Sequence, residues 1–153
     1  MALALERSLH PALQHPARPA VEAPESKLNI SVVFTSVPAT LAALRTAGSL
    51  ANRLAAYITL LVPQVVPFPL PLESPPVLLD WNERRLKVIA DESPVETKVN
   101  LYLCRDRFDT LNTVLKPHSI VVMGGPHAWW PTQEKKLARK LRRAGHEVIF
   151  TEA

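Results

Sequence analysis

The pattern of apolar and polar residues changes at position 28. Before it, residues 1–27 contain Pro11, Pro16, Pro19 and Pro24 and show no sustained periodicity, which predicts a flexible Pro-rich N-terminal tail. After it, short apolar runs alternate with segments of helical periodicity, the pattern of an α/β domain. We therefore divide the chain into a tail, 1–27, and one domain, 28–153.

Five runs of the domain have the hydrophobicity of β-strands. Residues 30–34 and 119–123 are almost unbroken apolar stretches, as expected for strands covered on both faces. Residues 57–62 and 147–151 are also strand-like, the latter half-exposed. Residues 98–104 alternate between apolar and polar, which indicates an edge strand with one wetter face.

Four segments between these runs have helical signals. Ser36 and Pro38 suit the start of the first helix. Gly48, in its middle, costs about 1 kcal/mol relative to Ala, so we expect it to mark close packing. The other helices are expected over 76–90, around 108–115 and over 131–144. The candidate inward-facing residues of the first, second and fourth helices are Leu41, Leu44, Ala51, Leu54 or Ala55, Leu78, Trp81, Ile89, Leu137 and Leu141.

The element order predicts a doubly wound five-stranded parallel sheet with helices on both faces, because crossovers between parallel strands are right-handed. The two most apolar strands should be neighbours at its centre. A ligand of such a sheet binds outside the carboxyl ends of the strands, at the topological switch point. This places Thr35, Ser36 and residues 124–132 around any pocket.

Residues 54–72 contain no charged residue and are almost long enough to cross a bilayer. Pro63, Pro67, Pro69 and Pro71 lie within them, and proline breaks helical hydrogen bonding. We therefore expect a buried strand followed by a Pro-rich loop over 63–75, without regular structure, and no membrane span.

The composition is 47% hydrophobic and 21% charged, which allows a sizeable core and argues against global disorder. The single cysteine, Cys104, excludes an internal disulfide framework and suggests a reducing compartment. Glu6 and Arg7 interrupt the first apolar residues, so the N-terminus does not match a secretory signal. A cytoplasmic location is the resulting expectation.

The domain resembles the universal stress proteins over 28–153. The first strand and helix, 30–54, read like the opening unit of that family. Ala55-Ala56-Tyr57-Ile58-Thr59-Leu60-Leu61 matches its second strand, and residues 120–124 match its fourth strand and first loop glycine. The resemblance implies a universal stress protein or adenine nucleotide alpha hydrolase-like fold, a homodimer, and a non-catalytic regulatory role in the stress response.

ATP-binding members of that family hold phosphate and ribose with a loop of the type G-x-x-G, nine residues, G-[S/T]. Glycines allow backbone N–H groups to approach phosphate. Gly124 matches the first glycine, but His127 stands at the second, and Leu137-Ala138 stands at the final pair. The resemblance thus implies ATP or another nucleotide at a modified loop. The candidate nucleotide-binding residues are Thr35, Ser36, Met123, Gly124, Gly125, His127, Trp130 and Thr132.

The segment Gly124-Gly-Pro-His-Ala-Trp-Trp-Pro131 has two interpretations. It could be the modified ligand loop, with Trp129 or Trp130 stacked on a base and the hydroxyl of Thr132 near an anion. It could equally be a turn whose tryptophans pack over the sheet edge or against a dimer partner. We favour the second interpretation, in which one tryptophan stays available to a partner.

The whole net charge of +4 lies in residues 135–153, where six basic residues stand against Glu147 and Glu152. The basic residues Lys135, Lys136, Arg139, Lys140, Arg142 and Arg143 are expected on the outer face of the last helix. A solvated face is the favoured interpretation, and a site for nucleic acid, anionic lipid or an acidic protein is the alternative. Nucleic acid is not favoured as a partner, because no RNA-binding or helix-turn-helix signature is present. The candidate partner-binding residues are Trp129, Trp130, Lys136, Arg139, Lys140 and Arg143.

The sequence does not favour an enzyme. Cys104 with His118, His127 or His146 could form a nucleophile and base, but a packed thiol at the end of a strand is the favoured interpretation. The histidines lack zinc-site spacing, and neither a P-loop nor a G-x-S-x-G motif is present. Three hypotheses stay open. The first is a regulatory module that binds a nucleotide, and the second is a protein-interaction domain with a decayed nucleotide pocket that uses the Trp-Trp loop and the basic C-terminal helix. The third and weakest is a nucleotide-dependent enzyme, for which His127 is the one candidate general base.

Overall fold

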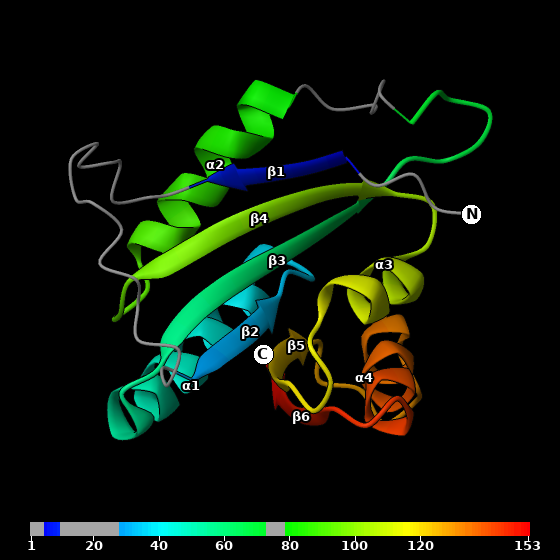
Figure 1. Ribbon diagram of the computed structural model, residues 1–153. Coiled ribbons are helices and arrows are strands. Elements are labelled where there is room, and N and C mark those ends of the chain that lie inside the picture. The colour runs from blue at the N-terminus through cyan, green and yellow to red at the C-terminus, as the bar shows by residue number, and fades with distance from the viewer. Residues whose placement is uncertain (1–4, 10–27, 73–78) are drawn as a thin grey trace.

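The fold is an open β-sheet between two layers of helices (Figure 1). The computed structural model describes residues 5–9, 28–72 and 79–153 of the chain. The elements in chain order are β1 (Leu5–Leu9), β2 (Asn29–Val33), α1 (Val37–Leu54), β3 (Tyr57–Val65), α2 (Leu79–Asp91), β4 (Thr97–Cys104), α3 (Arg107–Val114), β5 (Ile120–Gly125), α4 (Gln133–Arg143) and β6 (Glu147–Glu152).

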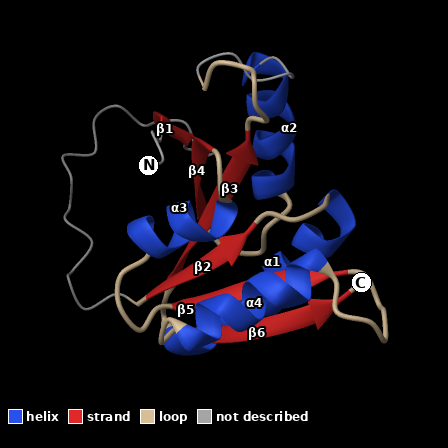
Figure 2. Ribbon diagram, turned by 90° about the vertical axis from the view of Figure 1, so that its right-hand side faces the viewer, coloured by secondary structure: helices blue, strands red, loops and turns tan. Residues whose placement is uncertain are grey.

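The strand order is β1-β4-β3-β2-β5-β6, with β1 and β6 at opposite edges (Figure 2). The last five strands of the chain run parallel to one another. The predicted five-stranded parallel sheet of a doubly wound, Rossmann-like α/β fold is therefore confirmed. The two most apolar strands are neighbours at its centre, where Ile30 of β2 pairs with Ile120 of β5. The chain reverses its direction of winding between these strands, which makes their carboxyl ends the topological switch point.

A sixth strand extends the parallel sheet, and the sequence did not predict it. Residues Leu5–Leu9, inside the predicted tail, form β1 and pair antiparallel to β4, from Leu5 opposite Leu103 to Leu9 opposite Val99. The rest of the predicted tail lies outside the described residues. An edge strand exposes unpaired N–H and C=O groups, and β1 satisfies those of β4. The wetter face predicted for β4 is wrong, since Asn100 and Tyr102 are buried.

Two hydrophobic clusters lie on opposite faces of the sheet. Under α1 and α2, buried side chains of these helices meet those of β2, β3, β4 and β5, including Leu44, Leu60 and Leu86. Under α3 and α4, Leu111, Leu137 and Leu141 pack on Val33, Val121 and other strand residues. The alternation of side chains along each strand supplies both clusters from the same strands. Helices on both faces, as predicted, are thus confirmed.

The first helix follows its predicted start. The Ser36 hydroxyl accepts a hydrogen bond from the backbone N–H of Ala39, and Pro38 lies in the first turn. Gly48 marks close packing, as expected, because a Cβ there would lie 2.1 Å from Cγ of Pro94. Leu54 is 42% exposed and Ala55 is exposed as well, so the inward assignment of either residue is wrong. Leu78 and the side chain of Trp81 lie outside the described part of the chain.

Candidate functional site

The main cavity of the domain opens at the carboxyl ends of β2 and β3. It has a volume of about 610 Å³, within the usual range for small-molecule sites. The described residues that line it are Phe34, Thr35, Val62, Pro63, Gln64, Val65, Arg85, Leu86, Arg107, Gln133 and Glu134. One wall is therefore apolar, and the polar groups include two guanidinium groups, two amides and one carboxylate.

The cavity exists because β3 is longer than its neighbour β2. The last register pair of the two strands is Val33 with Leu61, whereas β3 continues to Val65 alongside β4. Four residues of β3 therefore extend beyond β2, roughly 13 Å at the rise of a strand, and they form a step. Proline has no backbone N–H to donate to a neighbouring strand. Pro63 fits in this extension because the edge of β3 on which that N–H would lie faces the space beyond the end of β2.

The sequence pattern predicts that this strand ends before Pro63 and that an irregular loop covers 63–75. That boundary is wrong for residues 63–65, which belong to β3. Proline usually ends a central strand because it cannot donate to the ladder. Here the neighbouring strand has already ended. The part of the loop after residue 72 lies outside the described residues.

Arg85 and Arg107 reach the main cavity from opposite faces of the sheet. Arg85 belongs to α2, whose residues Leu86 and Ile89 pack in the cluster under α1 and α2. Arg107 is the first residue of α3, which packs on the other face. Asp106 fixes the start of α3, because its carboxylate accepts a hydrogen bond of 2.9 Å from the Asp109 N–H. Residues of both helical layers therefore line the cavity.

A smaller cavity, the side cavity, adjoins the main cavity and has a volume of about 290 Å³. Its described lining residues are Val65, Arg105, Asp106, Arg107, Phe108, Gln133, Lys136, Leu137 and Lys140. Val65, Arg107 and Gln133 line both cavities. The two cavities are thus parts of one groove that runs from β3 to the space between α3 and α4.

Arg105 has a structural task at the edge of this groove. Its guanidinium donates hydrogen bonds of 2.7 Å to the Val66 carbonyl and 2.8 Å to the Leu70 carbonyl. It also lies over the ring of Phe68, 4.1 Å from the centroid. These contacts hold residues 66–70 beside β4 and so fix the outer border of the groove.

The two glycines that begin the predicted ligand loop are packed against the rest of the domain. The Thr35 hydroxyl donates to the Gly124 carbonyl at 2.8 Å, and a Cβ on Gly124 would lie 2.5 Å from the Ala39 carbonyl oxygen. Gly125 faces the side chains of Phe150 and Glu134. Both glycines belong to β5, which continues two residues past its predicted end at Met123. These glycines allow close packing within the fold.

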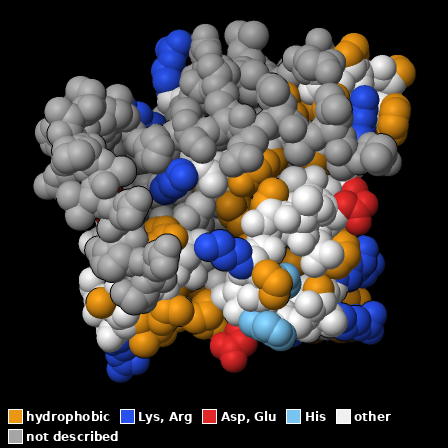
Figure 3. Space-filling model, in the orientation of Figure 1, with side chains coloured by type: hydrophobic (Ala, Val, Ile, Leu, Met, Phe, Trp, Pro, Cys, Tyr) orange, Lys and Arg blue, Asp and Glu red, His pale blue; other side chains and the backbone are white. Residues whose placement is uncertain are grey.

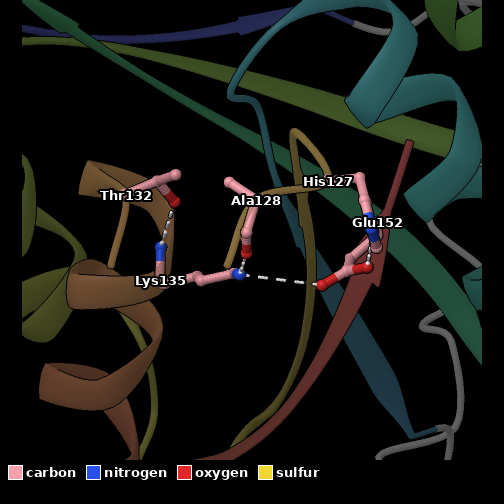
Figure 4. A network of polar contacts seen from close by, with 5 residues as sticks. All are labelled: His127, Ala128, Thr132, Lys135 and Glu152. Carbon is pink, nitrogen blue, oxygen red and sulfur yellow. Dashed lines mark hydrogen bonds and ion pairs between the residues drawn. The ribbon is translucent and has the colours of Figure 1, made fainter. Parts of the chain in front are cut away.

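Polar contacts tie the rest of this loop to α4 and β6 (Figure 4). His127 Nδ1 pairs with Glu152 Oε2, and the Lys135 ammonium donates to the Ala128 carbonyl and lies 3.7 Å from Glu152 Oε1. The hydrogen bond from His127, followed by the charge interactions with His127 and then Lys135, lowers the pKa of Glu152. Thr132 caps α4 by accepting from the Lys135 N–H at 3.2 Å.

The structure places one of the predicted nucleotide-binding residues at the main cavity and the others elsewhere. Thr35 lines the main cavity. The described linings of the two groove cavities do not include Ser36, Met123, Gly124, Gly125, His127, Trp130 or Thr132. Met123 is fully buried, Ser36 caps α1, and Gly124 and Gly125 pack within the fold. His127, Trp130 and Thr132 lie between β5 and the first turn of α4.

Trp129 and Trp130 project from this loop. Their side chains are 93% and 54% exposed, and their rings meet edge to face with centroids 5.8 Å apart. At 93% exposure the Trp129 ring does not pack over the sheet edge, so for this residue the packing interpretation would need a partner. They form an exposed aromatic pair.

The basic residues of α4 serve different tasks. Lys136 and Lys140 line the side cavity, Lys135 turns to the loop, and Arg142 donates to the Val148 carbonyl at 3.0 Å. Arg139 and Arg143 are exposed. On the face seen in Figure 3, the Lys and Arg side chains are dispersed among other surface residues. The prediction of one outer face for all six is wrong for Lys135.

Sequence reasoning did not find Gln64, Arg85, Arg107 or Gln133 as site residues. A usable signal existed for Arg107, since it follows the predicted strand 98–104 closely and the carboxyl ends of parallel strands share one edge of the sheet. Whether Arg85 reaches the site depends on how α2 is rotated about its axis. Gln64 was missed because Pro63 indicated that the strand ends before it. Gln133 lies just inside the predicted fourth helix, at its first turn.

Cys104 is buried at the end of β4. Its thiol donates to the Gln64 carbonyl at 3.7 Å, and burial raises its pKa. A thiol in this state is a poor nucleophile. Within the described ranges, no group of three or more His, Cys, Asp or Glu residues could hold a metal ion.

No helix in the described ranges is long and apolar enough to cross a membrane. Comparison with known proteins does not assign the chain to a family. No protein-family model matches the sequence, and no curated protein matches it either.

Proposed function

We propose that this chain is a non-catalytic regulatory module, similar to the universal stress proteins that its sequence resembles, and that it binds a nucleotide. The observation that supports this proposal is the main cavity of about 610 Å³ at the carboxyl ends of the parallel strands. We place the nucleotide there rather than at the glycines of loop 124–132, because Thr35, Ala39 and neighbouring side chains already pack against Gly124 and Gly125.

The lining of the main cavity suits the parts of a nucleotide. Arg85 and Arg107 provide guanidinium groups, which bind phosphate through paired hydrogen bonds. Phe34, Val62 and Leu86 provide an apolar wall for a base. Gln64, Gln133 and Glu134 add amide and carboxylate groups that can pair with ring or sugar polar atoms. ATP is the nucleotide with which the proposal is tested.

Binding rather than catalysis is proposed because of the residue types in the cavity. Its described lining contains one carboxylate, Glu134, and neither histidine nor cysteine. His127, the general base considered from the sequence, pairs with Glu152 outside the cavity. A single buried cysteine suits a reducing compartment, so we place the protein in the cytoplasm.

The test is a calorimetric titration of the full chain with ATP and magnesium. The full chain is required because Leu5–Leu9 pair with β4. Arg107→Gln should weaken binding roughly tenfold or more, the effect of losing one charge-assisted contact. Arg139→Gln removes one charge from an exposed site of α4 and should leave the affinity unchanged. Absence of heat and of any thermal shift at millimolar ATP would reject the proposal, as would equal affinity of Arg107→Gln and wild type.

The exposed aromatic pair supports a second candidate function, a protein-interaction domain. Two neighbouring tryptophans exposed to 93% and 54% are typical of a contact surface. The simplest partner is a second copy, which would also account for the expected homodimer. Sedimentation equilibrium should then show a dimer that Trp129→Ser weakens and that Phe68→Ser, a change at another exposed aromatic residue, leaves intact. A monomer at every concentration would exclude this self-association.

A further inference from the structure

The helix α1 and the edge strand β6 form a third cavity, which we call the α1–β6 groove. Its volume is about 470 Å³. Its described lining residues are Arg45, Thr46, Ser49, Leu50, Arg53 and Ile149. None of these residues is in the described lining of the main cavity or the side cavity. The α1–β6 groove is therefore a separate site, and what binds in it does not depend on the proposed nucleotide.

Two arginines give the α1–β6 groove a positive charge. Arg45 and Arg53 are exposed, and within the described part of the chain neither guanidinium forms an ion pair. Leu50 is half-buried and Ile149 is 38% exposed, so an apolar surface accompanies the two charges. A guanidinium presents its N–H donors in a planar fork that matches a carboxylate. The groove thus suits a ligand that carries carboxylates together with an apolar group.

The strand β6 lies at the edge of the sheet beside this groove (Figure 2). The Glu147 N–H donates to the Ser119 carbonyl, and the Ala153 N–H donates to the Gly125 carbonyl, both at 3.0 Å. Backbone groups of alternate residues in a strand point to the same side. The odd-numbered residues of β6 therefore direct their N–H and C=O groups to β5, and the even-numbered residues direct theirs away from the sheet.

This outer edge of β6 retains free hydrogen-bonding groups. The Val148 carbonyl accepts a hydrogen bond of 3.0 Å from Arg142. No described residue pairs with the outward N–H and C=O of Phe150, the next residue whose backbone points outward. Unpaired N–H and C=O groups along an edge strand are a template on which a further strand can pair. The free edge and the two arginines thus meet at one place on the surface.

We infer that the α1–β6 groove and the outer edge of β6 bind an extended acidic peptide segment of a partner protein. The segment adds a strand to the sheet, so its backbone pairs with β6. Its side chains on one face point into the groove, where two carboxylates pair with Arg45 and Arg53. A nucleic acid could pair with the arginines but would leave the free backbone groups of β6 unused.

The spacing of the arginines defines the sequence pattern of this segment. Arg45 and Arg53 are eight residues apart in α1, which corresponds to about 12 Å along the helix axis. Side chains four residues apart in a strand lie on the same face, about 13 Å from one another. We therefore expect an acidic residue, an apolar residue two positions later and a second acidic residue two positions after that. The apolar side chain then lies against Leu50 and Ile149.

The experiment measures the fluorescence anisotropy of a labelled peptide, Ser-Glu-Thr-Val-Thr-Glu-Ser, as the full chain is added. A peptide of the same composition, Ser-Glu-Glu-Val-Thr-Thr-Ser, is the first control, because its two carboxylates lie on opposite faces of a strand. The chain is tested as wild type, as Arg45→Gln/Arg53→Gln and as Arg139→Gln/Arg143→Gln. The second double variant removes the same charge from exposed positions of α4. Thermal unfolding verifies that both variants fold.

We expect wild type to bind the first peptide at least about fivefold more tightly than its control, consistent with two exposed ion pairs. Arg45→Gln/Arg53→Gln should lose this preference, whereas Arg139→Gln/Arg143→Gln should change the affinity less than about twofold. Two further peptides test the backbone pairing, one N-methylated at both glutamates and one at both threonines. One of the two should bind roughly tenfold more weakly, because its methyl groups face β6 and remove hydrogen bonds.

Four results would overturn the inference. Equal affinity for the two unmethylated peptides, or equal losses in the two double variants, would reduce the binding to general charge attraction. Undiminished binding of both N-methylated peptides would exclude a strand added to β6. If oligothymidylate binds through Arg45 and Arg53 and the peptide does not, the groove is a nucleic-acid site. If the chain forms a dimer that excludes the peptide, the edge of β6 belongs to a second copy.

Discussion

The Thr35 hydroxyl donates a 2.8 Å hydrogen bond to the carbonyl oxygen of Gly124. This bond joins the carboxyl ends of β2 and β5, the two strands between which the sheet changes its direction of winding. The Ala39 carbonyl lies against Gly124 from α1, and Thr151 lies against it from β6. The topological switch point is thus filled by the fold, and the main cavity lies beside it, over the ends of β2 and β3.

Gly124→Ala should therefore destabilise the domain. Its new Cβ would lie 2.5 Å from the Ala39 carbonyl oxygen, a backbone atom that can move only with α1. We expect a loss of about 1–3 kcal/mol, the usual cost of overpacking, measured by urea denaturation. The control is Gly125→Ala, whose nearest atom is the outer end of the Phe150 ring at 2.7 Å. A smaller loss for Gly124→Ala than for Gly125→Ala would contradict this account.

Gly48→Ala should also destabilise the domain, although alanine is the better helix former by about 1 kcal/mol. The added methyl would lie 2.1 Å from Cγ and 2.9 Å from Cδ of Pro94. A double-mutant cycle isolates this contact. Gly48→Ala should cost about 1–3 kcal/mol in wild type and much less in Pro94→Ala, which lacks both atoms. Equal costs in the two backgrounds would show that Pro94 is not the obstacle.

The fold could be predicted from the sequence because its signals are local. The apolar runs at 30–34 and 119–123 marked central strands, Ser36 marked a helix start, and the handedness of crossovers then fixed the sheet. The strand β1 could not be predicted in this way. Its pairing with β4 joins residues nearly one hundred positions apart, and no local periodicity records such a partner.

The candidate site could be predicted only in part. The rule that ligands bind at carboxyl ends located the correct edge of the sheet and selected Thr35. The neighbouring strand β3 supplies more of the lining, because it extends beyond β2. This extension could not be predicted, since Pro63 indicates the end of a strand. The sequence also could not show that Gly124 is enclosed by Ala39, since a glycine that permits close packing and one that admits phosphate look alike in a sequence.

Ala55→Gly should stabilise the domain. Ala55 follows α1 with φ 51° and ψ 40°, a left-handed conformation that costs a residue with a Cβ about 1 kcal/mol relative to glycine. The residue is exposed, so the change removes little packing. We expect a gain of about 0.5–1 kcal/mol in the free energy of unfolding. The reciprocal change, Gly145→Ala at φ 99°, should destabilise it. Changes of the same sign at both sites would refute this conformational explanation.

The stability of the domain should fall as the pH is lowered below about 6.5, because of His146. Its side chain is buried, and its Nδ1 accepts a hydrogen bond of 3.2 Å from the Ser119 N–H. A protonated ring cannot accept that bond. Burial, with a smaller contribution from the charge of His118, lowers the pKa of His146 below its ordinary value of 6.5.

The sign follows from proton linkage. Between pH 6.5 and the lowered pKa of His146, the unfolded chain binds a proton that the folded chain does not, so the free energy of unfolding decreases as the pH falls. The slope from this one group is at most about 1.4 kcal/mol per pH unit, and it disappears below the folded pKa. In His146→Asn the amide oxygen can replace Nδ1 as acceptor and does not titrate. Urea denaturation at several pH values should therefore show a shallower slope for this variant, and an NMR titration of the wild-type imidazole should give the lowered pKa directly. An unchanged slope in His146→Asn would assign the pH dependence to other groups.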